Sequence, residues 1–105
     1  MEYNTNIQDL NECEKLVMFV ISRIQKTPQG CFSMAELNKK NKIKKNNINL
    51  DLVMKYLIDK GLIFKGNKKD MLCVSHRGKI IEHEIEKENL GKELPYKVTR
   101  NRNNL

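Results

Sequence analysis

The stretch from Lys44 to Val74 constrains the fold of this 105-residue chain more than any other part of it. Apolar residues recur there at the spacing of one helix face: Leu50, Val53, Met54, Leu57 and Ile58. This i, i+3, i+4, i+7, i+8 pattern predicts an amphipathic helix over about 47–60. We expect Gly61 to end that helix in the left-handed conformation, as glycine commonly does just past a helix end.

Two short apolar runs follow that helix, and a basic segment separates them. Residues 62–64 and 71–74 have the length and composition of strands, and residues 65–70 between them contain Gly66 and three lysines. A glycine-containing segment between two such runs predicts a β-hairpin. Helix, stop, strand, basic turn and strand, in this order, are typical of a recognition helix followed by a β-hairpin wing.

A long first helix is predicted over about 9–26, where Asp9 or Asn11 can cap the start. It has more apolar residues than one helix face packed on a small core can bury: Leu10, Leu16, Val17, Phe19, Val20, Ile21 and Ile24. That surplus suits either a central helix or a dimer interface. Thr27, Pro28, Gln29 and Gly30 then break the helical pattern.

The segment after this break predicts a strand, a helix and a turn. Cys31 and Phe32 form a short extended piece that could add a third strand beside the wing. Ser33 and Glu36 have capping-box spacing, which predicts a second helix from Met34 to about Lys40. We expect residues 41–45 to form the turn before the third helix, with Ile43 pointing inward.

The chain after the wing predicts one more helix and a tail. Ser75 is expected to cap a fourth helix over about 76–89, and Gly91 is expected to end it. The fold class is therefore mainly α with a small β-hairpin, an α+β fold. One domain is predicted at 1–91, and residues 92–105 are expected to be a basic, flexible tail, although docking through Tyr96 and Val98 is an alternative.

Positive charge is concentrated on the same central segment. The chain has a formal net charge of +7, and residues 39–79 contain twelve Lys or Arg against three Asp or Glu. Clustered positive charge is the electrostatic footprint of a protein that binds a polyanion. A lysine-rich solvated surface with no binding role is the alternative interpretation.

Several function classes find no support in the sequence. Cys13, Cys31 and Cys73 form no CxxC pair, and an odd count favours reduced cysteines packed as small apolar residues. His76 and His83 share a helix face but lack further ligands, so we expect no metal and no cofactor. No catalytic constellation is visible, and we expect the protein not to be an enzyme. No apolar run reaches membrane-spanning length and no signal sequence is present, so a cytoplasmic location is expected.

Three motifs carry a resemblance to a known family: Ser33-Met34-Ala35-Glu36-Leu37, then Leu57-Ile58-Asp59-Lys60-Gly61-Leu62-Ile63, then Val74-Ser75-His76-Arg77-Gly78-Lys79. With them, the segment 33–85 resembles the winged helix-turn-helix family in the broad MarR-like sense. Size, the additional N- and C-terminal helices and the tail are also similar to the centromere-binding adaptors of tubulin-like plasmid partition systems (TubR-type). The small winged-helix single-strand binders encoded on staphylococcal cassette elements are a third relative.

The third helix departs from the family pattern in its exposed residues. Asp51, Leu52 and Tyr56 lie on the face away from the apolar stripe, and the helix contains no Arg, the commonest base reader. This composition argues against ordinary insertion of the full helix into the major groove.

The candidate DNA contacts fall into three groups. At the recognition helix they are Lys44, Lys45, Asn46, Asn47, Asn49 and Lys55; in the wing Lys65, Asn67, Lys68 and Lys69; at the fourth-helix start Arg77 and Lys79. Lysines can hold phosphates, and asparagine can pair with adenine N6 and N7. The alternatives are that Asn46 and Asn47 only cap a helix, and that the lysines and the hairpin are only solvated.

These observations predict a homodimeric, sequence-specific binder of double-stranded DNA. It would act as a transcriptional repressor or as a plasmid-partition adaptor, and a partner protein encoded nearby is part of this expectation. The alternatives are a single-stranded DNA-binding protein of a mobile-element replication system and a winged-helix protein-interaction adaptor. Base stacking on Tyr56 and Phe64 would support the single-strand alternative.

Overall fold

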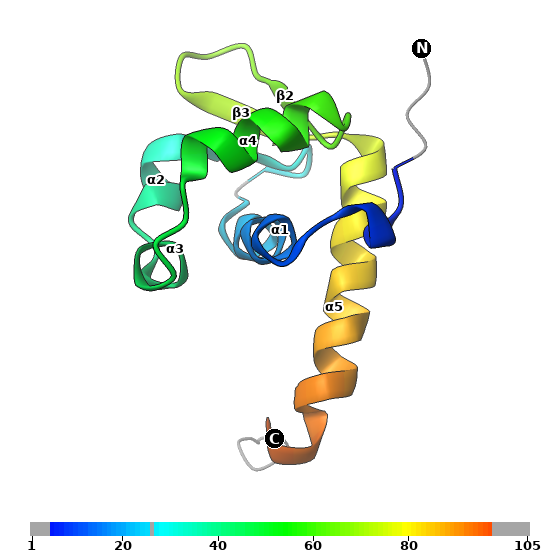
Figure 1. Ribbon diagram of the computed structural model, residues 1–105. Helices are drawn as coiled ribbons and strands as arrows, with labels where there is room; N and C mark the ends of the chain where they lie inside the picture. Colours follow the sequence, from blue (N-terminus) through cyan, green and yellow to red (C-terminus); the bar gives the residue numbers. More distant parts are fainter. Residues whose placement is uncertain (1–4, 26, 98–105) are drawn as a thin grey trace.

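The computed structural model describes residues 5–25 and 27–97, with side chains described as far as Glu88. The elements run in this order: η1 (Ile7–Asp9), α1 (Glu12–Ile24), β1 (Cys31–Ser33), α2 (Met34–Asn38), α3 (Asn41–Lys45), α4 (Leu50–Asp59), β2 (Ile63–Lys65), β3 (Met71–Val74) and α5 (His76–Lys97). Helices and a small antiparallel sheet make an α+β fold with a winged-helix arrangement, as the sequence predicts (Figure 1). The predicted tail residues 98–105, including Val98, lie outside the described part of the chain.

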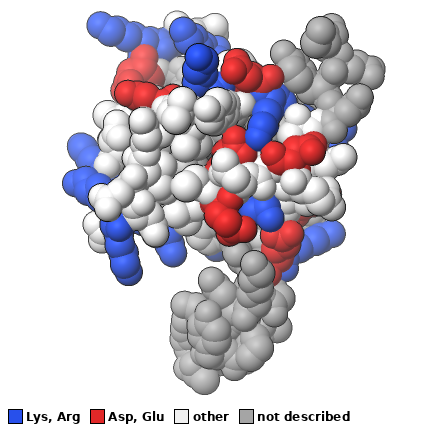
Figure 2. Space-filling model, viewed as in Figure 1, with Lys and Arg blue, Asp and Glu red and all other residues white. Residues whose placement is uncertain are grey.

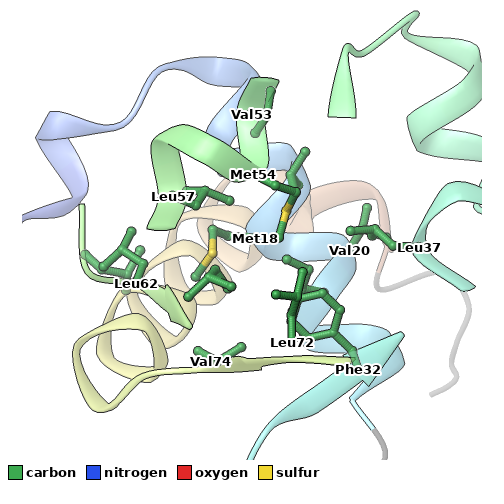
Figure 3. Close-up of a cluster of buried hydrophobic side chains, with 14 of the residues drawn as sticks. Met18, Val20, Phe32, Leu37, Val53, Met54, Leu57, Leu62, Leu72 and Val74 are labelled. Carbon is green, nitrogen blue, oxygen red and sulfur yellow. The ribbon is translucent and has the colours of Figure 1, made fainter. Parts of the chain in front are cut away.

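Helix α1 is the centre of the core, one of the two roles that its apolar residues allow. It begins at the capping residue Asn11, whose side chain accepts from the Glu14 backbone amide, and it contacts α2, α3, α4 and α5. Figure 3 shows Met18 of α1 among core residues of α4, including Met54 and Leu57. Burial of such side chains is the main favourable contribution to folding.

The surplus apolar surface expected on α1 is absent from the described structure, and that basis for a dimer is wrong. Most of the apolar residues in question are buried within one chain: Leu10, Val17, Val20, Ile21, Ile24, Ile81 and Ile85. Leu16 and Phe19 are partly buried against the same core, and Ile80 is 36% exposed. The core buries more of these side chains than expected because α1 contacts four other helices.

The sheet has the strand order β1-β3-β2, so the predicted third strand beside the wing is confirmed. Both pairings are antiparallel, and the register places Cys31 and Phe64 on either side of Cys73. Paired residues project to the same face of a sheet. Cys31, Cys73 and Phe64 therefore form one row, which we call the outer row, on the face opposite the buried Phe32 and Leu72.

Two expectations for the cysteines are wrong. Cys31 and Cys73 form a disulfide between β1 and β3, with an S–S distance of 2.08 Å. Strand pairing brings these residues together, although 42 positions separate them in the sequence. Cys13 is exposed on α1 rather than packed among apolar neighbours.

The step from β3 into α5 depends on one serine and one glycine. The Ser75 hydroxyl accepts from the Gly78 amide at 3.0 Å and donates to the Gly61 carbonyl at 2.6 Å. A Cβ at Gly78 would lie 2.3 Å from the Leu62 carbonyl oxygen, so only glycine permits this close approach of helix and strand. Ser75 therefore starts α5 as predicted, and Gly61 ends α4 with φ of 77°.

Several predicted boundaries are wrong, and α1 is shorter than the predicted helix 9–26 at both ends. The expected turn at 41–45 is the short helix α3, in which Ile43 is buried as predicted. Helix α4 begins at Leu50 rather than near residue 47, because the partly buried Ile48 packs on the core before the helix starts. Helix α5 does not end at Gly91 and continues to Lys97, since a glycine inside a helix only weakens it unless it turns left-handed.

Candidate nucleic-acid interface

The junction between α3 and α4 carries the first group of candidate contacts. Lys44 and Lys45 are exposed in the last turn of α3, not at the start of the recognition helix as predicted. Because α3 ends at Lys45, these lysines precede α4 by a short connection rather than forming its first turn. They are nevertheless adjacent in the chain to the α4 N-terminus, where backbone amides favour anionic groups.

The three asparagines of this junction have different roles. The Asn46 side-chain amide donates to the Lys42 carbonyl at 2.7 Å and so closes the end of α3. The Asn49 side chain accepts from the Leu52 amide at 3.3 Å and is the α4 cap, a role expected for Asn46 or Asn47. Asn47 is exposed with φ of 53°, and its side chain makes no hydrogen bond to any described residue. Its amide is therefore the one in this set that is free to contact a base.

The exposed side of α4 is mixed in chemistry. Leu52 is 45% exposed and Tyr56 is 43% exposed. Asp51, Lys55 and Asp59 are exposed beside them. The two carboxylates would repel a phosphate backbone. The exposed side of α4 is therefore atypical of a DNA-reading helix, as its sequence predicts.

The wing is the β2–β3 hairpin, and Asp70, the last residue of its loop, joins it to β1 and α2. The Asp70 carboxylate accepts from the Ser33 hydroxyl at 3.3 Å and from the Ala35 amide at 3.4 Å. The Met34 amide also donates to the Asp70 carbonyl at 3.2 Å. Asp70 thus shares with Ser33 the capping of α2, a positioning role that sequence reasoning missed. The only local signal was an Asp in a turn, where its side chain commonly bonds to backbone amides.

A groove of about 620 Å³ separates α4 from the wing. Its apolar lining includes Met34, Met54, Ile58, Met71 and Leu72. Four lysines also line it, and we call them the groove lysines: Lys55, Lys65, Lys68 and Lys69. The structure thus brings together all four predicted wing contacts, including Asn67, with Lys55, one predicted contact of the recognition helix.

The groove lysines keep their charge available to a partner. Among the described side chains, none of them forms an ion pair or a side-chain hydrogen bond. In contrast, Lys60 forms an ion pair with Glu14 at 2.8 Å, and Lys15 forms one with Glu88 at 3.7 Å. Figure 2 shows lysines over the wing and on the α2–α3 side of one face, with a broad uncharged area between them.

The predicted contacts at the start of α5 lie apart from this face. The Lys79 ammonium group donates to the Pro28 carbonyl at 3.2 Å. Lys79 also lines a separate hollow with His76, Ile80 and His83. Arg77 is partly buried in the first turn of α5, which Figure 1 places on the side of the molecule away from the wing tip.

Two further features are absent from the described part of the chain. Among the described side chains, which end at Glu88, no group of three from His, Cys, Asp or Glu could hold a metal ion. No helix within residues 5–25 and 27–97 is both long and apolar enough to span a membrane. Comparison of the chain with protein families, curated proteins and solved structures found no match.

Proposed function

We propose that the protein binds double-stranded DNA through the face made of the α3–α4 junction, the groove and the wing. The observation that supports this most strongly is the groove itself. It is lined by four lysines, none of them ion-paired to a described side chain, and by three carboxylates. Phosphate contacts supply much of the affinity of proteins for DNA. Lys44 and Lys45 add charge at the other end of α4.

The proposed binding mode assigns different tasks to the two ends of α4. The wing tip, with Lys68 and Lys69, would enter a minor groove or follow a backbone. Asn47 would read a base edge near the start of α4, because Asp51 and Asp59 disfavour deep insertion of the helix. Sequence specificity would therefore come from few contacts, and the lysines would set position and overall affinity.

The biological role that fits such a protein is transcriptional repression or plasmid partition. Both roles use a homodimer on DNA and, for partition, a partner protein. A cytoplasmic location is part of this proposal, and in a reducing cytoplasm the Cys31–Cys73 pair would be expected mainly as thiols.

A charge reversal in the wing tests the proposal. A DNA site is first selected from a library of random duplexes, and affinity is then measured by fluorescence anisotropy at several salt concentrations. The double variant Lys68→Glu with Lys69→Glu should bind all duplexes more weakly. The slope of log affinity against log salt should become less steep by about two, since about 0.9 counterion is released per phosphate neutralised.

The matched control is Lys79→Glu with Lys87→Glu, which changes the net charge equally on exposed positions of α5. It should leave duplex affinity within about threefold and the slope within about one unit, because both positions lie on α5, away from the groove and the wing. Lys79→Glu also removes the bond to the Pro28 carbonyl, so the thermal midpoint of this control is measured as well. Equal weakening by both double variants would show a net-charge effect and would remove the wing from the interface.

A second candidate function is a protein-interaction adaptor. Leu52 and Tyr56 are large, apolar or aromatic and exposed on α4, next to Asp51 and Asp59 rather than to lysines alone. Aromatic residues are enriched at protein interfaces, and such a surface favours a protein partner more than DNA. If Leu52→Ser with Tyr56→Ser leaves duplex binding intact but abolishes capture of a partner encoded next to this gene, the adaptor role would account for this face.

A further inference from the structure

The outer face of the sheet carries a second groove, separate from the one beside α4. It has a volume of about 490 Å³ and is lined along the outer row by Cys31, Phe64 and Cys73. Phe64 is 50% exposed, more than any other large apolar residue whose side chain the structure describes. Antiparallel pairing with β3 holds β2 at the base of this groove, so Phe64 projects from an ordered strand.

The rim of this second groove is basic and rich in side-chain amides. Lys65 and Lys68 line it, as do Gln29 and Asn67, and no Asp or Glu is among its lining residues. The groove beside α4, in contrast, contains three carboxylates, from Asp51, Asp59 and Asp70. An exposed aromatic ring, two lysines and two amides complement a nucleobase and its phosphate: the ring can stack on the base, the amides can bond to its edge, and the ammonium groups can hold the backbone.

We propose that the outer face of the sheet binds an unpaired nucleotide of a single-stranded nucleic acid, with the base stacked on Phe64. The proposal rests on the nucleic-acid function inferred above, and it names a second ligand class at the other side of the same wing. Since Lys65 and Lys68 line both grooves, a duplex on the α4 side and an unpaired strand on the outer side would be neighbours. The protein would then favour DNA in which a duplex adjoins a single strand.

The test measures binding of a single-stranded oligonucleotide of about ten thymidines and of the same strand containing one 2-aminopurine. Phe64→Leu keeps an apolar side chain but removes the aromatic face, and it should weaken single-strand binding about tenfold or more. It should also abolish the quenching of 2-aminopurine fluorescence that stacking produces. Phe64→Tyr should retain affinity within about threefold, since it keeps the ring.

Tyr56→Leu is the matched control, because Tyr56 is a similarly exposed aromatic residue that lines neither groove. It should leave single-strand binding and quenching unchanged. Circular dichroism and the thermal midpoint check that each variant folds. If Phe64→Leu does not fold, the wild type decides the test, because the absence of 2-aminopurine quenching in it overturns the proposal.

The outcomes separate this inference from the duplex proposal. Loss of single-strand binding in Phe64→Leu, with duplex affinity within about twofold, supports the outer-face site. Unchanged single-strand affinity in Phe64→Leu overturns it, as does an equal loss for duplex or a larger loss in Tyr56→Leu. A change in sedimentation mass of Phe64→Leu would also overturn it, in favour of a second chain on this face. If the wild-type chain binds single strands through Phe64 but no duplex, the inference stands and the duplex proposal fails.

Discussion

At the scale of single residues, Asn47 is the strongest candidate for a base contact, and its backbone complicates the obvious test. Its φ of 53° lies in the left-handed region, where asparagine and glycine are tolerated better than alanine. Asn47→Gly therefore removes the amide without adding backbone strain. We expect the ratio of specific to non-specific duplex affinity to fall about tenfold, within the range for loss of one bidentate contact.

Asn46→Ala is the comparison for this prediction, because the Asn46 side chain is already bonded to the Lys42 carbonyl. That variant should change specificity little. A uniform loss of affinity for every duplex in Asn47→Gly, measured by anisotropy competition, would assign Asn47 to phosphate contact or to local structure.

Glu82 of α5 gives a pH-dependent prediction for stability. Burial raises the pKa of Glu82 from the ordinary value of 4.5 to about 7, opposed by the hydrogen bond from Gln25 at 2.5 Å. The like charge of Glu86 raises the pKa further, and Lys79 lowers it. Between these two pH values the folded chain keeps a proton on Glu82 that the unfolded chain releases. The stability that this proton contributes is therefore fully present below about pH 4.5 and is lost as the pH rises through about 7.

The corresponding measurement is urea unfolding of the wild type and of Glu82→Gln at half-unit steps from pH 4.5 to 8. The difference in unfolding free energy between the two should change by up to about 3 kcal/mol across this interval, with the wild type losing stability as the pH rises. Other titrating groups are common to both chains and cancel. Parallel curves would show that Glu82 has an ordinary pKa in the folded chain.

At this scale the sequence predicted which side chains of α4 are buried, but not which asparagine caps the helix. The predicted apolar stripe of α4 is confirmed, with Leu50, Val53, Met54 and Leu57 buried. Several asparagines close together made the cap ambiguous, because each can bond to the backbone. The contact of Ile48 with the core, a tertiary effect, decided that Asn49 is the cap.

At the scale of secondary-structure elements, the disulfide between β1 and β3 determines how firmly the wing is attached. It closes a loop with a sequence separation of 42, and such a link restricts the unfolded chain. We expect reduction with dithiothreitol to lower the unfolding free energy by about 2–4 kcal/mol. Wing hydrogen bonds should also exchange faster, since the covalent link between β1 and β3 would be lost.

Cys31→Ser with Cys73→Ser should be insensitive to dithiothreitol, whereas Cys13→Ser should respond like the wild type because Cys13 is free. Alkylation and mass spectrometry of the unreduced, denatured protein should find one reactive thiol per chain. Three reactive thiols would mean that the disulfide does not form in the purified protein.

The elements themselves were largely predictable, and so was the place of β1 beside the wing, whereas the register of the strands was not. Glycine at 61 and serine at 75 mark boundaries through local backbone chemistry, which a single sequence displays. The pairing of Cys31 with Cys73 depends on the register of strands that lie far apart in the chain. Helix α3 was missed because its charged sequence has only Ile43 as an apolar signal.

At the scale of the whole molecule, the feature that favours a homodimer is the projecting second half of α5. Helix α5 contacts α1, β3 and η1, and Ile85 is its last buried side chain among those described. Figure 1 shows the second half of α5 leaving the body of the protein. Isolated helices of fewer than about 12–15 residues are marginal in water, so packing against a second copy would stabilise this half.

We therefore expect sedimentation equilibrium at micromolar concentration to give about twice the monomer mass of 12.3 kDa. A chain ending at Glu88 should sediment as a monomer, because it lacks the projecting half of α5 but keeps the core. Two-fold symmetry would present two copies of the proposed DNA face, so duplexes selected by the full chain should contain inverted half-sites about one helical turn apart. A monomer mass for the full chain would remove the dimer, and selected sites should then lack this symmetry because one chain presents one face.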